Sequence, residues 1–233
     1  MANNLVSFDS PYYPYRKVIT GANTLKGSEL IPYKMLMYLL DLPDAAGYQP
    51  VDDNDRARVR LAKYLWYDGP DPLSQPLPTP TQKLSMLWDP NRPDINTDED
   101  KVKHPKGYRL YWQRMTGMSQ LDAQIVMKCF IGRVFETRKF ETTIGITFEI
   151  YVNVNLETNT RTSSYQRSYD IEQCLHDALD GVDMAGIGTV SFARQDHVYN
   201  GSEPLWDENT SLGRTVNCSI LWAEGGGNVI KPY

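Results

Sequence analysis

The segment 140–154 shows the strictest alternation of apolar and polar residues in the chain, and it constrains the fold more than any other feature. Its apolar face is formed by Ile144, Ile146, Phe148, Ile150, Val152 and Val154. The residues between them, Thr147, Glu149, Tyr151 and Asn153, lie on the opposite face. Because side chains alternate across a strand, this pattern predicts one long β-strand with a single buried face.

A second long strand is predicted immediately before it, over 123–137. One face carries Ile125, Met127, Cys129 and Ile131, and the other carries Val126, Phe130 and Val134. Both faces of this strand are therefore expected to be covered. The two segments form a hairpin several nanometres long, which exceeds the usual strand length. Further strands are predicted at 108–115, 187–194 and 212–223.

An amphipathic helix is predicted over 170–180, between these strands. Its buried stripe follows helical spacing and comprises Ile171, Cys174, Leu175, Ala178 and Leu179. Asp170 with Gln173 suits a capping box, and Gly181 suits the end of the helix. The order of elements predicts an α+β fold, with a mostly antiparallel sheet, a long hairpin and one packed amphipathic helix.

The N-terminal region is predicted to be helical. Apolar spacing indicates helices at 29–41, capped by Ser28, and at 54–67. Four basic residues of the second helix, Arg56, Arg58, Arg60 and Lys63, are assigned to a solvated face. Five prolines predict a stiff connector over 68–81, and the polar segment 89–107 is predicted to be a surface loop.

The predicted organisation has three parts. Residues 1–107 hold an N-terminal arm, the helices and the connector, 108–224 form the α+β domain, and 225–233 form a flexible tail that begins with three glycines. The arm contains Tyr12, Tyr13 and Tyr15 between prolines, which exclude a regular helix. Such an arm can pack on its own body, on a neighbour, or remain loosely ordered.

Composition argues against several classes of protein. The 233 residues carry a formal net charge of −5, which argues against a protein that grips a phosphate backbone with Lys and Arg. Three widely spaced cysteines indicate a reducing compartment without a disulfide framework. No stretch approaches the length and apolarity of a membrane span, so a cytosolic site of synthesis is expected.

The motifs of common enzymes are missing from the sequence. It contains no G-x-S-x-G elbow, no phosphate-binding P-loop and no G-x-G-x-x-G fingerprint. The three histidines, His104, His176 and His197, have no metal-ligand spacing. We therefore predict no catalytic residue, no cofactor and no metal ligand, and expect a protein that is not an enzyme.

One combination of segments resembles a known family. Residues Tyr165–Gly181 follow the alternating strand and precede Ile187–Phe192, and the last strand opens with Leu212-Gly-Arg-Thr-Val216. Over about half the chain, roughly 108–223, this pattern is similar to the tail-terminator and neck proteins, or head–tail connectors, of tailed bacteriophages. The helical N-terminal region and the 89–107 segment depart from the smallest members of that family.

The resemblance implies a structural protein that forms a ring, usually sixfold, between head and tail. Implied partners are other copies of the chain, neighbouring neck and tail proteins, and genomic DNA that passes through without specific binding. The implied location is the virion, after assembly in the host cytoplasm. Candidate subunit-interface residues are Tyr12, Tyr13, Tyr15, Phe135, Phe140, Tyr151 and Arg214.

Three alternatives remain open from the sequence. The first is another phage structural subunit, of the tail tube, collar or baseplate. The second is an enzyme with a divergent site built on one of the histidines. The third is an intracellular binding module that docks partners through the Pro-rich segment 70–80.

Overall fold

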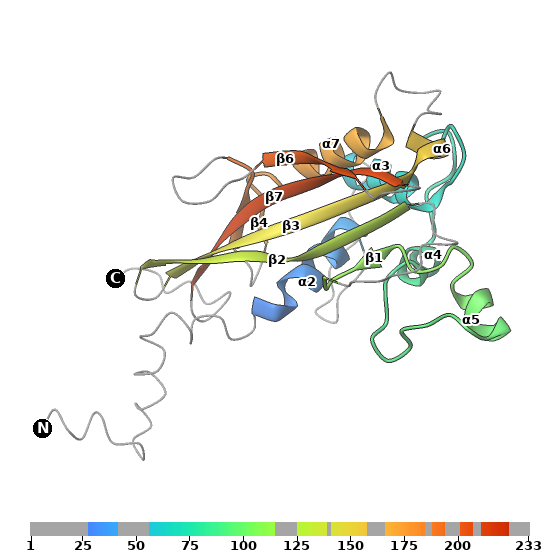
Figure 1. Ribbon diagram of the computed structural model, residues 1–233, viewed down its shortest axis with the longest axis horizontal. Helices are drawn as coiled ribbons and strands as arrows, with labels where there is room; N and C mark the ends of the chain where they lie inside the picture. The colour runs from blue at the N-terminus through green and yellow to red at the C-terminus, as the bar shows by residue number, and fades with distance from the viewer. Residues whose placement is uncertain are drawn as a thin grey trace, which may run out of the picture.

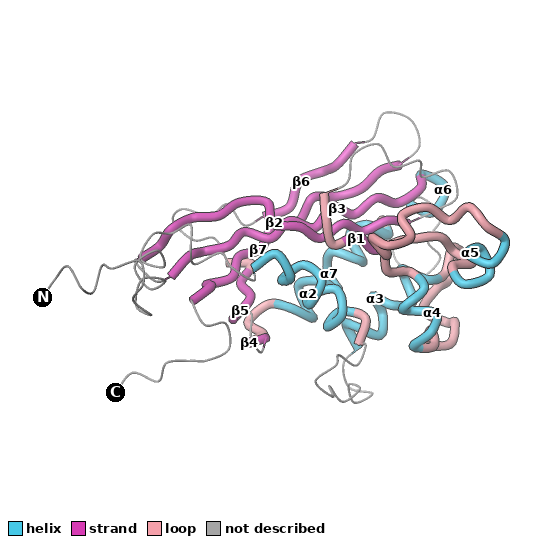
Figure 2. The backbone as a smooth tube through the Cα atoms, turned by 90° about the horizontal axis from the view of Figure 1, so that it is seen from below, coloured by secondary structure: helices cyan, strands magenta, loops and turns pink. Residues whose placement is uncertain are grey.

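The predicted fold class is confirmed: the chain forms helices and a mixed, mostly antiparallel sheet. The computed structural model describes residues 28–41, 56–114, 125–138, 141–157, 166–184, 188–193, 201–206 and 211–223. The predicted arm and the glycine-rich tail lie outside these residues. In Figure 1 the long strands run across the molecule, and α2, α3 and α7 lie on one side of them (Figure 2).

The sheet has seven strands within the described residues. Their bounds are Leu110–Tyr111 (β1), Ile125–Arg138 (β2), Glu141–Asn153 (β3), Asp183–Met184 (β4), Gly188–Ser191 (β5), Gly201–Trp206 (β6) and Ser211–Ala223 (β7). The order is β1-β2-β3-β7-β5-β4, and β6 also pairs with β7. Only the β1–β2 pair is parallel.

The long hairpin β2–β3 forms as predicted, with one correction in each strand. The register shifts between Ile131 and Arg133, which places Val134 opposite Ile144, on the inner face. The prediction had placed Val134 on the other face, because regular alternation cannot anticipate a β-bulge. In β3 the strand ends at Asn153, and Val154 begins the single helical turn Val154–Glu157 (α6).

Helix α7 spans Arg167–Leu179 and buries the predicted stripe against the sheet and α3. It begins three residues earlier than predicted, so the capping box of Asp170 and Gln173 is wrong. The carboxylate of Glu157, on α6, instead accepts a 2.9 Å hydrogen bond from the backbone N–H of Ser168 in the first turn. Gly181 follows the helix with φ = 73°, the conformation that favours glycine.

The N-terminal helices are α2 (Ile31–Leu39), preceded by the 3-10 turn Ser28–Leu30 (η3), and α3 (Arg56–Trp66). Ser28 is not the N-cap of α2, because that position is Leu30, without a side-chain hydrogen bond. Arg58 is not on a solvated face either. It is buried, donates a 2.8 Å hydrogen bond to the carbonyl of Tyr38 and lies over the ring of that residue.

The segment between α3 and β2 is more structured than the sequence suggests. The connector includes a turn closed by a 3.2 Å hydrogen bond from Gln75 N–H to the carbonyl of Pro72. It leads into α4 (Pro80–Ser85), close to the short helix that the sequence predicts over 81–88. The predicted loop 89–107 contains α5 (Asp98–Lys103), which has a capping box between Thr97 and Asp100. The predicted strand 108–115 is reduced to two residues of β1.

Strand β6 was missed, because Gly201-Ser-Glu-Pro-Leu-Trp206 has neither alternation nor β-branched residues. It forms by pairing with Leu212–Asn217 of β7. Pro204 is tolerated because β6 lies at an edge of the described sheet, where an N–H is not needed on the outer side.

One hydrophobic core runs through the N-terminal helices, the inner face of the sheet and α7. Representative buried members are Met35, Leu36, Leu61, Leu65, Met127, Phe148, Leu175 and Ile220. The core therefore crosses position 107/108, the predicted boundary between the first two parts of the chain. The long strands of the sheet and the N-terminal helices are stabilised as one packed unit.

Candidate assembly surfaces

The outer face of the sheet lies on the side opposite α2, α3 and α7 (Figures 1 and 2), and its central strands carry mainly polar side chains there. It is defined here by Lys128, Phe130, Thr147, Glu149, Tyr151, Thr215 and Asn217 of β2, β3 and β7. Thr147, Glu149, Thr215 and Asn217 are partly exposed. Among the described elements, no helix covers this face, but Lys128 and Phe130 are buried, so the surface open to another protein consists of the partly exposed residues of β3 and β7.

Polar contacts hold the side chains of this outer face in fixed positions. The Lys128 ammonium lies 3.7 Å from the Glu149 carboxylate and 4.5 Å from the centre of the Tyr151 ring. Tyr151 donates a 2.9 Å hydrogen bond to Glu149, and Thr147 donates a 2.8 Å bond to the side-chain oxygen of Asn217. Contacts of this kind reduce the conformational entropy that a partner must remove on binding.

A hollow with a volume of about 270 Å³ lies in the outer face. Arg114 and Arg133 supply positive charge around it, while Glu149 and Glu203 supply negative charge. Because charges of both signs line this hollow, it does not favour the binding of a particular small ion. A polar and mixed-charge surface of this kind is typical of protein contacts that form after folding.

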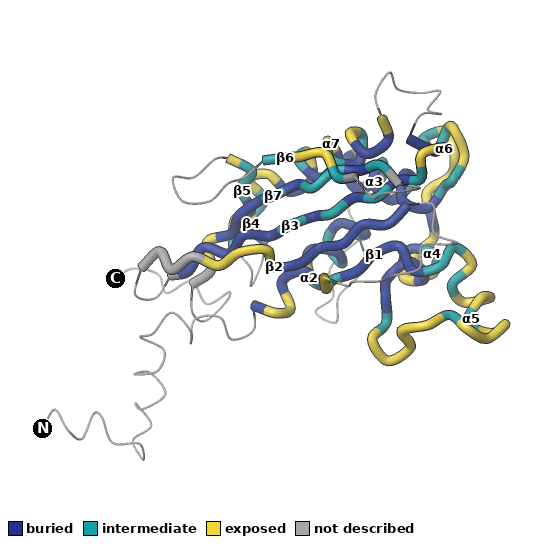
Figure 3. The backbone as a smooth tube through the Cα atoms, viewed as in Figure 1, coloured by how far each residue is buried: buried dark blue, intermediate teal, exposed yellow. Residues whose placement is uncertain are grey.

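The closed end of the hairpin extends beyond the helices (Figures 1 and 2). Along β2 the chain changes from buried to exposed after Ile131, and Gly132, Arg133 and Val134 are all exposed (Figure 3). Val134 has an exposed fraction of 42% although it lies on the inner face. On the paired strand Thr142, Thr143 and Ile144 are buried, so the surface available to another subunit at this end of the hairpin is the described part of β2 after Ile131.

The structure describes two of the seven predicted interface residues. Tyr151 packs against a small aromatic cluster of Trp88, Tyr108, Tyr111 and Val126 at the outer face. Arg214 lies on the helix side, where its guanidinium forms an ion pair with Glu172 of α7, donates to Ser202 of β6 and covers the ring of Tyr169 at 3.8 Å. Both side chains thus make contacts within the chain.

The other five predicted interface residues cannot be placed on these surfaces. Tyr12, Tyr13, Tyr15 and Phe140 lie outside the described residues. Phe135 lies in β2, opposite Thr143, but its side chain is outside the described part of the structure. Their role in subunit contacts stays a prediction.

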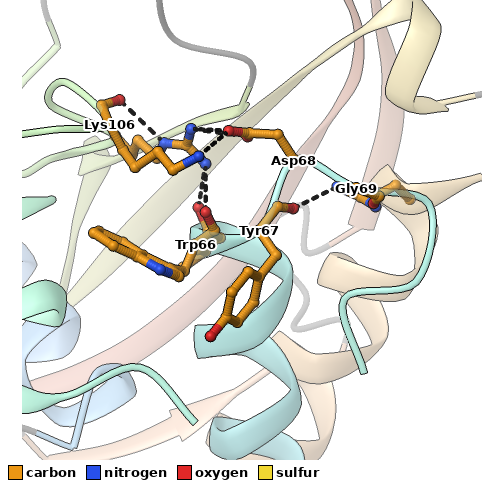
Figure 4. A network of polar contacts seen from close by, with 8 residues as sticks. Trp66, Tyr67, Asp68, Gly69 and Lys106 are labelled. Carbon is orange, nitrogen blue, oxygen red and sulfur yellow. Dashed lines mark hydrogen bonds and ion pairs between the residues drawn. The ribbon is translucent and has the colours of Figure 1, made fainter. Parts of the chain in front are cut away.

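Two buried arginines join the N-terminal helices to the rest of the fold, and neither role was predicted from the sequence (Figure 4). Arg109 donates 2.6 and 3.3 Å hydrogen bonds to the carbonyls of Leu65 and Trp66, in the last turn of α3, and forms a 2.8 Å ion pair with Asp68. Arg167, from α7, donates to the carbonyls of Tyr67 and Gly69. We call this set the arginine clamp.

The clamp satisfies carbonyl groups that have no partner inside α3. Burial lowers the pKa of Arg109, and the neighbouring Asp68 carboxylate acts in the opposite direction. Burial also lowers the pKa of Arg167. Since all of these donors contact groups of the chain itself, the clamp is a structural device that connects segments 65–69, 109 and 167.

The cysteines occupy the core positions that the sequence predicts. Cys129, Cys174 and Cys218 are buried and unpaired with one another. Burial raises the pKa of Cys174 to about 12 and that of the other two thiols above the usual range. Thiols of this kind are poor nucleophiles at neutral pH.

The described histidines lie on separate elements. His104 follows α5, where its Nδ1 lies 2.7 Å from the carbonyl of Ser85, and its ring packs on Tyr108. His176 packs on Phe192, and its Nε2 lies 3.8 Å from Glu172 on the same helix. His197 lies outside the described residues. The enzyme with a divergent site stays a hypothesis from the sequence.

Within the described ranges, no group of three His, Cys, Asp or Glu residues is arranged to hold a metal ion. The helices that the structure describes are all too short or too polar to cross a membrane. No protein-family model, no curated protein and no solved structure matches this chain. Its fold and surfaces are therefore the basis on which a function can be proposed.

Proposed function

We propose that this chain is a structural virion protein that forms a ring at the neck of a tailed bacteriophage. The ring joins the head or its connector to the tail and terminates the tail tube. The observation that carries the proposal is the β2–β3 hairpin, in which β2 is exposed from Gly132 to Val134, beyond the buried first half of the strand. A hairpin of this length gives each subunit a rigid element that reaches a neighbour.

The division between the two faces of the sheet supports this function. The inner face is closed by α2, α3 and α7, so the subunit folds around its own core. The outer face and the end of the hairpin carry fixed polar groups and exposed residues. This arrangement suits subunits that fold first and then assemble, as the parts of a virion must.

The negative net charge of the chain supports a role in which DNA passes through the ring without specific binding. A formal net charge of −5 disfavours tight contact with phosphates. A channel through such a ring lets the genome pass without specific binding. The protein assembles in the host cytoplasm with other neck and tail proteins and then becomes part of the virion.

Negative-stain imaging and size-exclusion chromatography of the purified full-length chain test the proposal. Imaging should show rings of uniform diameter, with the sixfold symmetry that is usual in the family the chain resembles. Chromatography should show a species several times heavier than the single chain of 26.6 kDa. A strictly monomeric protein at high concentration contradicts the proposal. Long tubes in place of single rings indicate a tail-tube subunit.

Particles made without the protein provide a second test. A neck protein predicts finished heads that are not joined to tails, and complementation with the intact chain should restore joined particles. Normal joined particles in its absence exclude the neck. A filter-binding assay at low salt should detect no sequence-specific binding of duplex DNA.

A further inference from the structure

A groove with a volume of about 410 Å³ lies beside β2. One wall comes from Leu30 and Pro32, where the chain enters α2. Another comes from Trp112, which follows β1, and the floor includes Phe130 and Ile131 of β2. Leu30 has an exposed fraction of 47%, so the groove presents apolar surface to solvent.

The outer edge of β2 is open along this groove. Strand β1 pairs with Met127 and Lys128 only, and the chain bends away from β2 at Trp112. Beyond Lys128, no other described strand pairs with the outer edge of β2, up to its end at Arg138. An open edge offers unpaired N–H and C=O groups to an extended peptide.

The chain that precedes the described residues begins at this same place. Residues 1–27 come before Ser28, and the turn Ser28–Leu30 forms part of the groove wall. Segment 11–20 of the arm is joined to Ser28 by residues 21–27, and these seven residues span about 25 Å when fully extended. The arm therefore starts beside a docking groove, and segment 11–20 can reach the groove of a copy that packs against this side of the subunit.

The arm also has the composition that an apolar groove next to a strand edge requires. Segment 11–20 reads Pro-Tyr-Tyr-Pro-Tyr-Arg-Lys-Val-Ile-Thr. Its two prolines favour an extended backbone, which is tolerated in an edge strand. Its tyrosines bring large apolar rings with polar tips, and Val18, Ile19 and Thr20 favour strand geometry.

We propose that segment 11–20 of one copy binds the groove of a neighbouring copy and adds a strand to the open edge of β2. We take the neighbour as the source, because the proposed ring places another copy beside each groove. In the ring, each subunit can donate its arm to the next. This inference rests on the proposed ring and identifies the surface through which neighbours are held.

Disulfide trapping between two differently tagged full-length copies tests the inference. One copy carries Tyr15→Cys and the other carries Gln113→Cys, at an exposed groove position. The three native cysteines are buried and do not compete. Mild oxidation of the mixture should give a covalent heterodimer as the main product. A copy with Gln75→Cys, exposed on the connector and not part of the groove, is the matched control and should give at least tenfold less.

The groove itself is tested by adding Leu30→Glu to the Gln113→Cys copy. This change should lower the yield of heterodimer at least tenfold, since it places a charge against the tyrosines. Leu84→Glu, at a leucine of similar exposure on α4, should leave the yield within twofold. Thermal unfolding of both variants establishes that each is folded.

The outcomes separate this inference from the proposed function. A single chain that carries both cysteines and closes only on itself, independently of dilution, overturns the exchange between copies. Rings without any trapped heterodimer also overturn it and leave the ring in place. Trapped heterodimers without rings support the groove as a contact between copies and contradict the neck function.

Discussion

The two halves of β2 belong to one strand but have opposite environments. In the first half, Ile125, Met127 and Cys129 are fully buried on the inner face, and Val126 is buried on the outer face. In the second half, Gly132, Arg133 and Val134 are exposed. The boundary coincides with the β-bulge after Ile131, three residues beyond Lys128, the last residue of β2 that pairs with β1.

This difference separates folding from assembly along a single element. The first half is covered on both faces, so its side chains contribute the area that stabilises the core. The second half continues the same ladder with β3, but its described side chains from Arg133 to Val134 are exposed. Changes in the first half should therefore alter the free energy of unfolding, and changes in the second should alter contacts between subunits. Stability must be measured in dilute, unassembled protein, since association stabilises the folded state.

The largest effect is expected from Phe148→Ala. Phe148 is fully buried on β3, opposite Cys129 and Val216. The substitution leaves a cavity between the sheet and the helices, and should lower the free energy of unfolding by about 4 kcal/mol. Urea denaturation measures this loss. A loss below about 1 kcal/mol contradicts a packed core beneath this part of the hairpin.

Arg109→Gln should have the next largest effect, about 3 kcal/mol, because it opens the arginine clamp. Asp68 and the carbonyl of Leu65 lose their buried partner. Arg60→Gln is the matched control, since Arg60 forms a half-exposed ion pair with Asp177 at 2.7 Å. The control should cost less than about 1 kcal/mol in urea denaturation. Equal losses in the two variants indicate that the clamp adds no stability.

The sequence predicts the elements whose pattern repeats over many residues. The alternation of β3 and the helical stripe of α7 are long, and one period accounts for each, so both were predicted within a few residues. The burial of the three cysteines follows from the same patterns. By contrast, β6 depends on pairing with β7, and its residues alone favour no strand.

The contacts that join distant segments could not be predicted. The roles of Arg58, Arg109 and Arg167 depend on carbonyl groups of residues distant in sequence, such as Tyr38, Leu65 and Tyr67. An arginine in a sequence does not reveal whether its guanidinium faces solvent or donates hydrogen bonds to the carbonyl groups at the end of a helix. The groove beside β2 could not be predicted either, because its walls come from segments near positions 30, 112 and 131. Candidate surfaces built in this way follow only from the three-dimensional arrangement.

Gly213→Ala should cost about 2 kcal/mol. A Cβ at this position would lie 1.8 Å from the carbonyl oxygen of Ile150, so β7 must move away from β3. Gly69→Ala is the control, since a Cβ there meets nothing within 4 Å, and it should change stability by less than about 0.5 kcal/mol. Urea denaturation compares the two variants. If Gly213→Ala leaves the free energy of unfolding unchanged, the close approach of β7 to β3 is contradicted.

The smallest effect on stability is expected at the end of the hairpin, from Val134→Thr. Threonine keeps the branched shape that favours a strand, and Val134 is already exposed, so the change should stay within about 0.5 kcal/mol. If stability falls by more than 1 kcal/mol, the second half of β2 belongs to the core and the comparison between its halves fails.

A charge at the same position tests whether this part of β2 is a contact surface between subunits. Val134→Glu should leave the dilute protein folded but reduce assembly into rings at least tenfold, because it places a charge where a neighbour is expected to pack. Val102→Glu, on α5 with an exposed fraction of 80%, is the matched control and should assemble normally. Size-exclusion chromatography across a range of concentrations measures both. Normal assembly of Val134→Glu shows that subunits meet elsewhere. Val134 is exposed and is not needed to fill the core. Loss of assembly with unchanged folding is therefore the result expected if this position is a contact surface.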